Sequence, residues 1–278
     1  MIKEDKFYYE IKPPKNFVPI DFGEIWRFRE LFYIFTWRDI KVRYKQTLVG
    51  IAWVVFQPFI MMLIFTVFFG ILAKLPSQGA PYPIFVYTGL LFWTYFSGAF
   101  INSCNSLVES QEIIKKVYFP RVILPISSTL AGLLDLVIAY LVLLALMAFY
   151  HYPPHLIGLI LAPLLMILTF LLAVGLGLVF SSINVKYRDV RYALSFFIQI
   201  LFFVTPIIYP PSLVPARFQW LLILNPMTGI IQTARASIIG QPAINWLSLG
   251  ISVAMISVLV LLGLYYFRKT ERFIADVV

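Results

Sequence analysis

Long stretches without a single charged residue set the strongest limit on how this chain can fold. No Asp, Glu, Lys or Arg occurs between Leu48 and Ala73, or between Leu136 and Val185. A helix crosses the hydrocarbon core of a bilayer with about 20 predominantly apolar residues. With 61% hydrophobic and 13% charged residues over 278 positions, the chain has more apolar surface than a water-soluble globule can bury. The sequence therefore predicts an integral membrane protein.

The apolar stretches divide into six predicted membrane-spanning helices. Turn-forming residues at Pro76–Pro83 and Tyr150–His155 interrupt the two longest charge-free runs. The predicted spans are Leu48–Ala73, Ile84–Leu107, Val122–Tyr150, Leu156–Ile183, Tyr192–Tyr209 and Ile244–Phe267. The expected fold is an all-α integral membrane protein, with a transmembrane domain at 48–267 between an N-terminal segment at 1–47 and a tail at 268–278.

The stretch between the fifth and sixth spans, 209–242, is apolar but too fragmented to cross a bilayer. It is interrupted by Pro210, Pro211, Pro215, Pro226 and Gly240. The pieces are shorter than a span, and backbone that stops partway through lipid is tolerated only where protein or a water-filled cavity satisfies it. We predict two short re-entrant or interfacial helices here, on the periplasmic side.

The basic residues separate by side of the membrane. Six spans place both termini on one side, and all but three of the 22 Lys and Arg residues fall there; the exceptions are Lys74, Arg217 and Arg235. Cytoplasmic loops carry an excess of Lys and Arg, so both termini are predicted to be cytoplasmic. This asymmetry accounts for the net charge of +9 and leaves little reason to expect a nucleic-acid partner.

A basic, aromatic segment at 24–45 precedes the first span and is predicted to be an amphipathic helix. Its apolar residues recur at helical spacing: Ile25, Phe28, Phe32, Phe35 and Val42. Another side of the helix carries the charged residues Glu24, Arg27, Arg38, Lys41 and Lys45. The aromatic residues Trp26, Tyr33 and Trp37 would lie at the depth of the lipid headgroups. Two roles are open: anchoring to anionic lipid, or a collar around a protein docked from the cytoplasm.

The connection between the second and third spans, Glu109–Arg121, predicts a short amphipathic cytoplasmic helix that stops at Pro120. It is either an ordinary solvated loop or a rigid projection into a soluble partner. In the second interpretation the contacting residues are Glu112, Lys115, Lys116, Tyr118 and Phe119, the two aromatic rings acting as hydrophobic anchors.

Asp135 is the one acidic residue inside the predicted spans. A carboxylate near mid-bilayer costs at least about 2.5–3.5 kcal/mol, so it is expected to face the bundle interior and to have a partner. We favour a structural hydrogen-bond anchor near a Tyr or Asn. The alternative is a proton relay in a secondary transporter, although a relay generally needs several titratable groups.

The sequence contains no motif for nucleotide binding or for familiar catalysis. There is no G-x-x-x-x-G-K-[S/T] loop, and no GxSxG, HExxH or CxxC. His151 and His155 are separated by two prolines, which exclude a shared helix face for a metal. Cys104 is the only cysteine, so no intrachain disulfide can form. We therefore predict no catalytic and no metal site in this chain.

Aromatic residues are abundant at span depth. One group is in the second span (Phe92, Trp93, Tyr95, Phe96, Phe100) and another is in the fifth (Phe196, Phe197, Phe202, Phe203). A sugar presents an apolar face that stacks on such rings, so these residues are candidates for lining a glycan path. Interfacial belts and ordinary helix packing explain aromatic residues equally well.

Four segments occur in order along the chain: RDIKVRYKQTLVGIAWVVFQP, KKVYFPRVILP, NVKYRDVRYALSFFIQILFFVTPIIYPPSLVP and LNPMTGIIQTAR. Together they resemble the membrane (permease) subunits of ABC exporters that move lipid-linked polysaccharides, such as O antigen and teichoic acid, across the bacterial inner membrane. The likeness extends from about Arg27 to Arg272.

The resemblance implies a homodimer with two copies of a separate cytoplasmic ATP-binding subunit, so that ATP and Mg²⁺ bind the partner and this chain holds no cofactor. It implies an interface helix at 24–45 that contacts this partner, with Arg27, Arg38 and Lys41 at its charged face. It also implies a coupling helix at 109–120 and periplasmic gate helices at 209–242.

By the same likeness, a glycan channel between the protomers would be lined by Trp93, Phe96, Phe100, Phe196, Phe197, Phe202 and Phe203. The substrate would be a long polymer on undecaprenyl diphosphate. We add the hypothesis that Arg38, Arg43 and Lys45 steer that diphosphate at the cytoplasmic entrance. The alternatives are an ABC exporter of small lipids or drugs on the same fold, and a proton-coupled secondary transporter that relies on Asp135.

Overall fold

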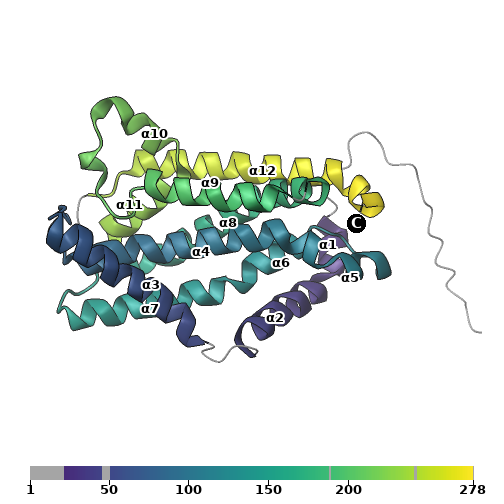
Figure 1. Ribbon diagram of the computed structural model, residues 1–278, viewed down its shortest axis with the longest axis horizontal. Helices are drawn as coiled ribbons and strands as arrows, with labels where there is room; N and C mark the ends of the chain where they lie inside the picture. Colours follow the sequence, from purple (N-terminus) through teal and green to yellow (C-terminus); the bar gives the residue numbers. More distant parts are fainter. Residues whose placement is uncertain (1–21, 46–50, 188, 241–242, 278) are drawn as a thin grey trace, which may run out of the picture.

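The computed structural model describes residues 22–45, 51–187, 189–240 and 243–277, and every regular element within these ranges is a helix. The long helices run side by side along one axis (Figure 1). One end of the bundle carries α1 (Phe22–Arg27), α5 (Gln111–Lys116) and the C-terminal end of α12 (Trp246–Val277). The opposite end carries α10 (Gln219–Ile223) and α11 (Pro226–Ile238).

Five helical segments in the described part of the chain are long and apolar enough to cross a membrane. They are Ala52–Leu72, Tyr82–Glu109, Ile123–Phe149, Leu156–Lys186 and Trp246–Glu271. Each corresponds to one of the predicted spans, and the all-helical membrane architecture is therefore confirmed. The first comprises α3 (Ile51–Phe65) and a π-helical segment, Thr66–Leu72; the second and fourth are α4 and α8.

The predicted fifth span, Tyr192–Tyr209, differs from the others. The structure has α9 (Val190–Val204) there, an apolar helix of 15 residues. At 1.5 Å per residue it is about 22 Å long, which is shorter than the hydrocarbon core of about 30 Å. The helix ends before Thr205-Pro206, because the residue before a proline is disfavoured in helical geometry.

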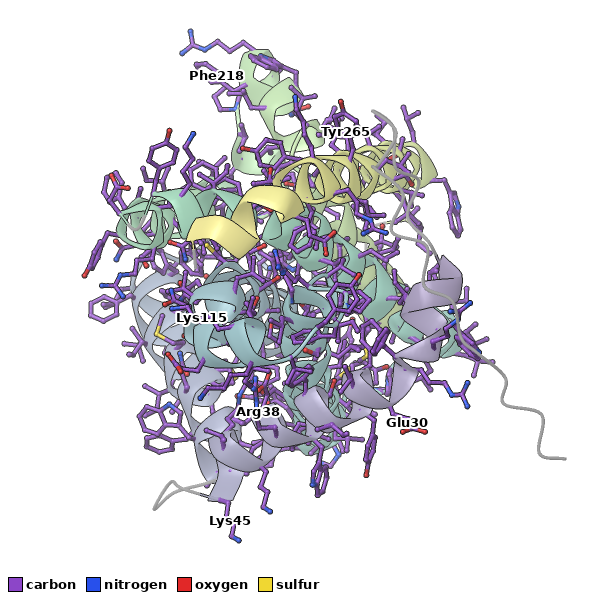
Figure 2. The ribbon with its side chains drawn as sticks, turned by 90° about the vertical axis from the view of Figure 1, so that its right-hand side faces the viewer. Glu30, Arg38, Lys45, Lys115, Phe218 and Tyr265 are labelled. Atoms are coloured by element: carbon purple, nitrogen blue, oxygen red, sulfur yellow. The ribbon has the colours of Figure 1, made fainter. Side chains whose placement is uncertain are left out.

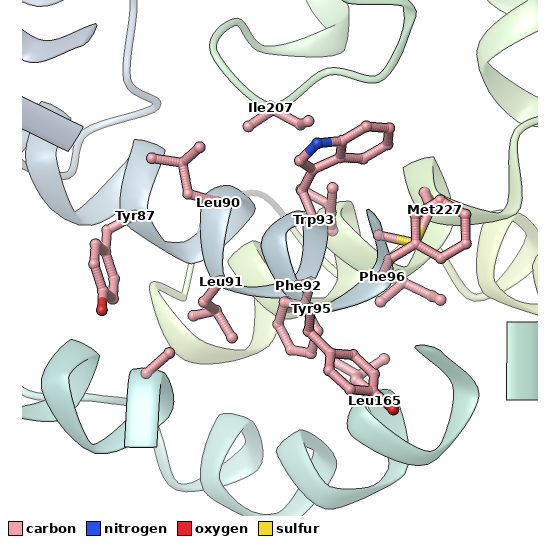
Figure 3. Packing of buried hydrophobic residues seen from close by; sticks show 14 of the residues in the cluster. Tyr87, Leu90, Leu91, Phe92, Trp93, Tyr95, Phe96, Leu165, Ile207 and Met227 are labelled. Atoms are coloured by element: carbon pink, nitrogen blue, oxygen red, sulfur yellow. The ribbon is translucent and has the colours of Figure 1, made fainter. Parts of the chain in front are cut away.

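The central helix of the bundle is α4 (Tyr82–Glu109). Within the protein, 78% of its spanning window is buried, compared with 17% for Ala52–Leu72. Its N-terminal two thirds are apolar on nearly all sides, which is typical of a buried helix, whereas polar residues such as Asn102 and Ser106 follow toward its C-terminal end. Figure 3 shows its side chains pointing in several directions, with Ile207 and Met227 on one side and Leu165 on the other.

The third span is two helices, α6 (Ile123–Ala131) and α7 (Leu133–Phe149), separated at Gly132. The ring of Tyr95 lies against this break, since a Cβ atom at Gly132 would lie 3.1 Å from it. The hydroxyl of Tyr95 donates a hydrogen bond to the carbonyl of Thr129 (3.2 Å). Asp135 lies in the first turn of α7, directly after the break.

Glycines allow α8 (Leu156–Lys186) and α12 to approach closely. A Cβ atom at Gly175 would lie 2.9 Å from the backbone nitrogen of Val260. A Cβ atom at Gly263 would collide with the carbonyl oxygen of Gly175. Small residues at such contacts are typical of membrane helix pairs, because they let the backbones pack against each other.

We expect Gly263→Val to force α8 and α12 apart and to lower stability by about 1–3 kcal/mol, the usual cost of overpacking. Thermal unfolding of the detergent-solubilised protein measures this loss. Gly250→Val is the matched control in the same helix, because a Cβ atom at Gly250 meets no atom within 4 Å. Equal melting temperatures for the two variants would contradict the proposed close contact.

The segment predicted to hold two re-entrant helices is only partly regular. Its first half consists of single 3₁₀ turns at Pro211–Leu213 and Ala216–Phe218, followed by the short α10. Its second half is α11, which starts at a cap: the Asn225 side chain accepts a hydrogen bond from the N–H of Met227 (3.1 Å). Most of α11 is buried against other helices, whereas α10 exposes apolar side chains.

The lone cysteine belongs to the interior. Cys104 is fully buried in α4, and its thiol lies 3.6 Å from the carbonyl oxygen of Phe180 in α8. It therefore acts as a small packing residue.

Candidate functional site

The end of the bundle that carries α1 and α5 collects most of the sequence-predicted site residues. Figure 2 looks onto this end and labels Glu30 and Arg38 on α2 and Lys115 on α5. The elements that carry Arg217 and Arg235 lie at the opposite end. The separation of charge that the sequence predicted is thus present in the folded chain.

The predicted interface helix is α1 followed, after a break at Phe28, by α2 (Arg29–Lys45). Its buried contact is Phe35, which packs against Phe119 with 5.5 Å between ring centroids. Ile25, Phe28 and Phe32 pack around the same cluster as predicted. Val42 does not: its side chain is exposed, because the end of α2 turns a different face to the bundle. The predicted headgroup residues Trp26, Tyr33 and Trp37 are all exposed.

The predicted coupling helix at 109–120 is shorter than expected. Only α5, Gln111–Lys116, is helical, because Ser110 separates it from α4 and the chain becomes extended at Val117. Glu112 and Lys116 form an exposed ion pair (3.4 Å) one turn apart, and Lys115 is also exposed. These side chains are accessible from outside the bundle.

The two predicted hydrophobic anchors next to α5 have different surroundings. Tyr118 is 80% exposed, whereas Phe119 is 4% exposed. Phe119 is therefore unavailable to a docked partner in this structure, and its ring instead holds α2 against the start of the third span. Tyr118 remains accessible as an anchor.

The charged residues of α2 are partly paired within the chain. Arg38 forms an ion pair with Asp39 (2.8 Å), and its guanidinium lies 5.1 Å from the ring centroid of Phe35. Arg27, Lys41 and Lys45 are exposed. They present positive charge at the surface of the bundle.

Asp135 binds the C-terminal end of α2. Its carboxylate forms an ion pair with Arg43 and accepts a hydrogen bond from the hydroxyl of Tyr44. Asp135 lies 12 residues after the start of α6, about 18 Å along a helix. The predicted anchor near a tyrosine is thus confirmed. The sequence did not reveal that α2, expected along the leaflet surface, reaches the middle of the third span.

This arrangement keeps the Tyr44 hydroxyl protonated. Burial raises the pKa of Tyr44, and its hydrogen bond to Asp135 raises it further, so that the hydroxyl keeps its proton and remains a donor. Because Arg43 is already paired with a carboxylate, its charge is largely neutralised locally. Of the three residues predicted to steer a lipid diphosphate, only Lys45 is a fully exposed cation.

The aromatic residues predicted to line a channel fall into two groups. Trp93, Phe96 and Phe100 are buried in α4, where they contact rings of the same chain. Phe202 is half-buried against Trp93 (5.7 Å between centroids). Three rings on α9 are exposed, namely Phe196, Phe197 and Phe203. In this arrangement of the helices, only the exposed rings have surface available to a ligand.

Arg235 is a structural residue whose role the sequence analysis missed. It lies in α11 with 2% exposure, and its guanidinium donates hydrogen bonds to the carbonyls of Phe85 (3.1 Å), Pro206 (2.7 Å) and Ile207. It also lies over the ring of Phe85 (3.6 Å to the centroid). A single arginine in an otherwise uncharged, apolar segment was the signal that a buried cation is present.

Among the residues that the structure describes, no group of three His, Cys, Asp or Glu side chains could hold a metal ion. His155 instead has a backbone role: its N–H donates a hydrogen bond to the carbonyl of Ile238 at the end of α11 (3.2 Å).

Comparisons with known proteins agree with this architecture. The O-antigen export system permease protein RfbA of Klebsiella pneumoniae is 28% identical over 248 residues, 89% of this chain and 95% of that protein. The Myxococcus xanthus protein of the same name is 30% identical over 217 residues, 77% of this chain and 82% of that protein. The polysialic acid transport protein KpsM of Escherichia coli is 23% identical over 242 residues, 84% of this chain and 91% of that protein.

The family model described as "ABC-2 type transporter" matches residues 30–239, from α2 to the residue after α11. This match includes nearly all of α2, all of α5, four of the five long apolar segments, and α9. Because it covers most of the chain, this protein belongs to the ABC-2 type transporter family of membrane proteins.

Proposed function

We propose that this chain is the channel-forming transmembrane subunit of an ATP-driven polysaccharide exporter. The observation that carries the proposal is the likeness to permeases named for O-antigen export and polysialic acid transport, which extends over 77–89% of the chain. The names of these relatives favour a polysaccharide over small lipids or drugs. A proton-coupled secondary transporter is disfavoured because Asp135 is paired with Arg43.

The ATP-binding partner would dock at the end that carries α2 and α5, and two copies of it would bind ATP and Mg²⁺. Exposed charged and aromatic side chains support this assignment, with Lys115, Lys116 and Tyr118 next to the exposed face of α2. The excess of positive charge supports a cytoplasmic location for this end. The chain would lie in the bacterial inner membrane with both termini inside the cell.

Two copies of the chain would form the channel. The support is the large apolar surface of α3, of the π-helical segment that follows it, and of α9, where Trp53, Phe68 and Phe196 are all at least half exposed. In this proposal α9, extended by 205–209, is the fifth of six spans, and α10 and α11 form the periplasmic gate. Phe196, Phe197 and Phe203 would contact the glycan of an undecaprenyl-diphosphate-linked substrate, while Lys45 attracts the diphosphate.

If α5 and the residues next to it couple the permease to its ATP-binding partner, substitutions there should abolish export without preventing the protein from folding. Tyr118→Ala combined with Lys115→Ala removes two exposed side chains, so the permease is expected to reach the membrane normally. Surface polysaccharide and copurification of the ATP-binding subunit are the measurements. We expect both to fall about tenfold or more, because exposed aromatic residues are frequent binding hot spots.

Tyr150→Ala is the control, because it removes an exposed tyrosine from the opposite end of the third span. Normal surface polysaccharide in the Tyr118 and Lys115 double variant would contradict the docking of a partner on α5.

A further inference from the structure

A cavity of about 840 Å³ lies between α3, α4 and α7. This volume is in the range of pockets that hold small organic ligands. Most of its wall is apolar and includes Trp53, Leu91 and Leu136, whereas one end carries Arg43 and Asp135. The cavity is thus amphipathic and lies between helices that are long and apolar enough to span a membrane.

Gly98 faces the open space of this cavity. It is among the lining residues, and a Cβ atom built on it would have no atom of another residue within 4 Å. By contrast, a Cβ atom at Gly132 would press against the ring of Tyr95. A larger side chain at position 98 therefore fills the cavity without displacing the helices that form it.

A second cavity of about 350 Å³ lies beside the first, nearer the charged end of the bundle. Arg43 is the lining residue that the two have in common. On α4, Gly98 of the first cavity is followed by Asn102, Ser106 and Glu109 of the second, all on one helix face. The second cavity is predominantly polar, so the pair offers a hydrocarbon-like inner part and a hydrophilic mouth.

The mouth presents charges of both signs on different helices. Arg38 and Arg43 come from α2, and Glu109 comes from the end of α4. Within the described ranges the Glu109 side chain forms no ion pair at contact distance, although Arg38 is close enough to attract its carboxylate. Asp39 and Asp135 are each paired with an arginine. Because both arginines already have a carboxylate partner and Glu109 adds a further negative charge, a headgroup that also carries a positive charge suits the mouth better than a purely anionic one.

We propose that the two cavities together bind one bilayer phospholipid with a zwitterionic headgroup. The phosphate lies toward Arg38 and Arg43, the ammonium lies toward Glu109, and an acyl chain extends past Gly98 between α3 and α4. The inner cavity provides apolar contact for the chain, and the mouth provides a partner for each charge of the headgroup. This site is separate from the exposed rings of α9, and it does not depend on which substrate the protein transports.

The test uses the full-length chain in phosphatidylglycerol nanodiscs that contain a trace of phosphatidylethanolamine with a diazirine on its acyl chain. After photolysis, peptides from α3 and α7 are analysed by mass spectrometry. Gly98→Leu is expected to reduce this labelling about tenfold, which corresponds to about 1.4 kcal/mol of lost binding. Gly250→Leu is the matched control, because that glycine also faces open space but lies on α12.

A competition experiment tests the headgroup. Unlabelled phosphatidylethanolamine is expected to displace the probe about tenfold better than phosphatidylglycerol does, and Glu109→Gln is expected to abolish this difference, since a charged hydrogen bond is lost. Unchanged labelling in Gly98→Leu, or equal loss in Gly250→Leu, would overturn the site. Stronger displacement by phosphatidylglycerol or by a polyprenyl phosphate would overturn the assigned occupant.

Discussion

Replacing Arg235 with methionine is expected to prevent the protein from folding stably. The substitution leaves the carbonyls of Pro206 and Ile207 without the donors that Arg235 provides inside the protein, and it removes the Arg235 hydrogen bond to the helical carbonyl of Phe85. Each unsatisfied group costs about 1–3 kcal/mol, and the cation–π contact with Phe85 is lost as well. The total is comparable with the stability of a whole domain, about 5–15 kcal/mol.

The measurements are the yield of monodisperse protein in detergent and its thermal unfolding. Arg217→Met is the matched control, because Arg217 is exposed in the same segment of the chain. Arg235→Lys is expected to be nearly as damaging, since one ammonium group cannot reproduce the planar fork of donors that reaches carbonyls on two different segments. An Arg235→Met protein that melts within a few degrees of the unmodified one would show that this cluster does not hold α11 in place.

The second large effect is expected at Asp135. Asp135→Leu leaves the Arg43 cation without its carboxylate and removes the acceptor of the Tyr44 hydroxyl. Breaking a buried ion pair from one side costs about 3–5 kcal/mol, and a value near the lower limit is expected because both side chains keep some exposure. Asp135→Leu with Arg43→Leu should recover most of the loss, since an apolar pair can replace a buried ion pair. Thermal unfolding of the two variants measures the recovery.

Asp135→Asn separates the structural role from a proton relay. Asparagine can still accept the hydrogen bond from Tyr44, but it cannot bind and release a proton. We therefore expect Asp135→Asn to retain export once its folding has been verified. Loss of export in a normally folded Asp135→Asn protein would restore the relay interpretation that the sequence left open.

The long spans were predictable because length and hydropathy are local properties of the sequence. In spans such as Leu156–Lys186 and Trp246–Glu271, an apolar side chain can face either lipid or protein. These spans could therefore be found without knowing how the helices pack. The predicted fifth span was harder, because α9 ends early before a proline-rich stretch whose path depends on contacts with α4 and α11.

The site residues were less predictable than the spans, because their roles depend on contacts between distant segments. Phe119 and Tyr118 are adjacent in the sequence, yet Phe35 covers only one of them. Similarly, Trp93 and Phe196 are both aromatic residues at span depth, but one lies in the core and the other is exposed. Periodicity alone could not separate them, since the part of α4 around Trp93 is apolar on nearly every side.

The buried position of Cys104 has a practical consequence. The thiol of Cys104 has no exposed surface and packs against α8. Maleimides and spin-label reagents therefore have little access to it. Cysteines engineered at exposed positions of the native chain would therefore carry nearly all of the label. Spectroscopic distance measurements on this transporter can begin without a cysteine-free background.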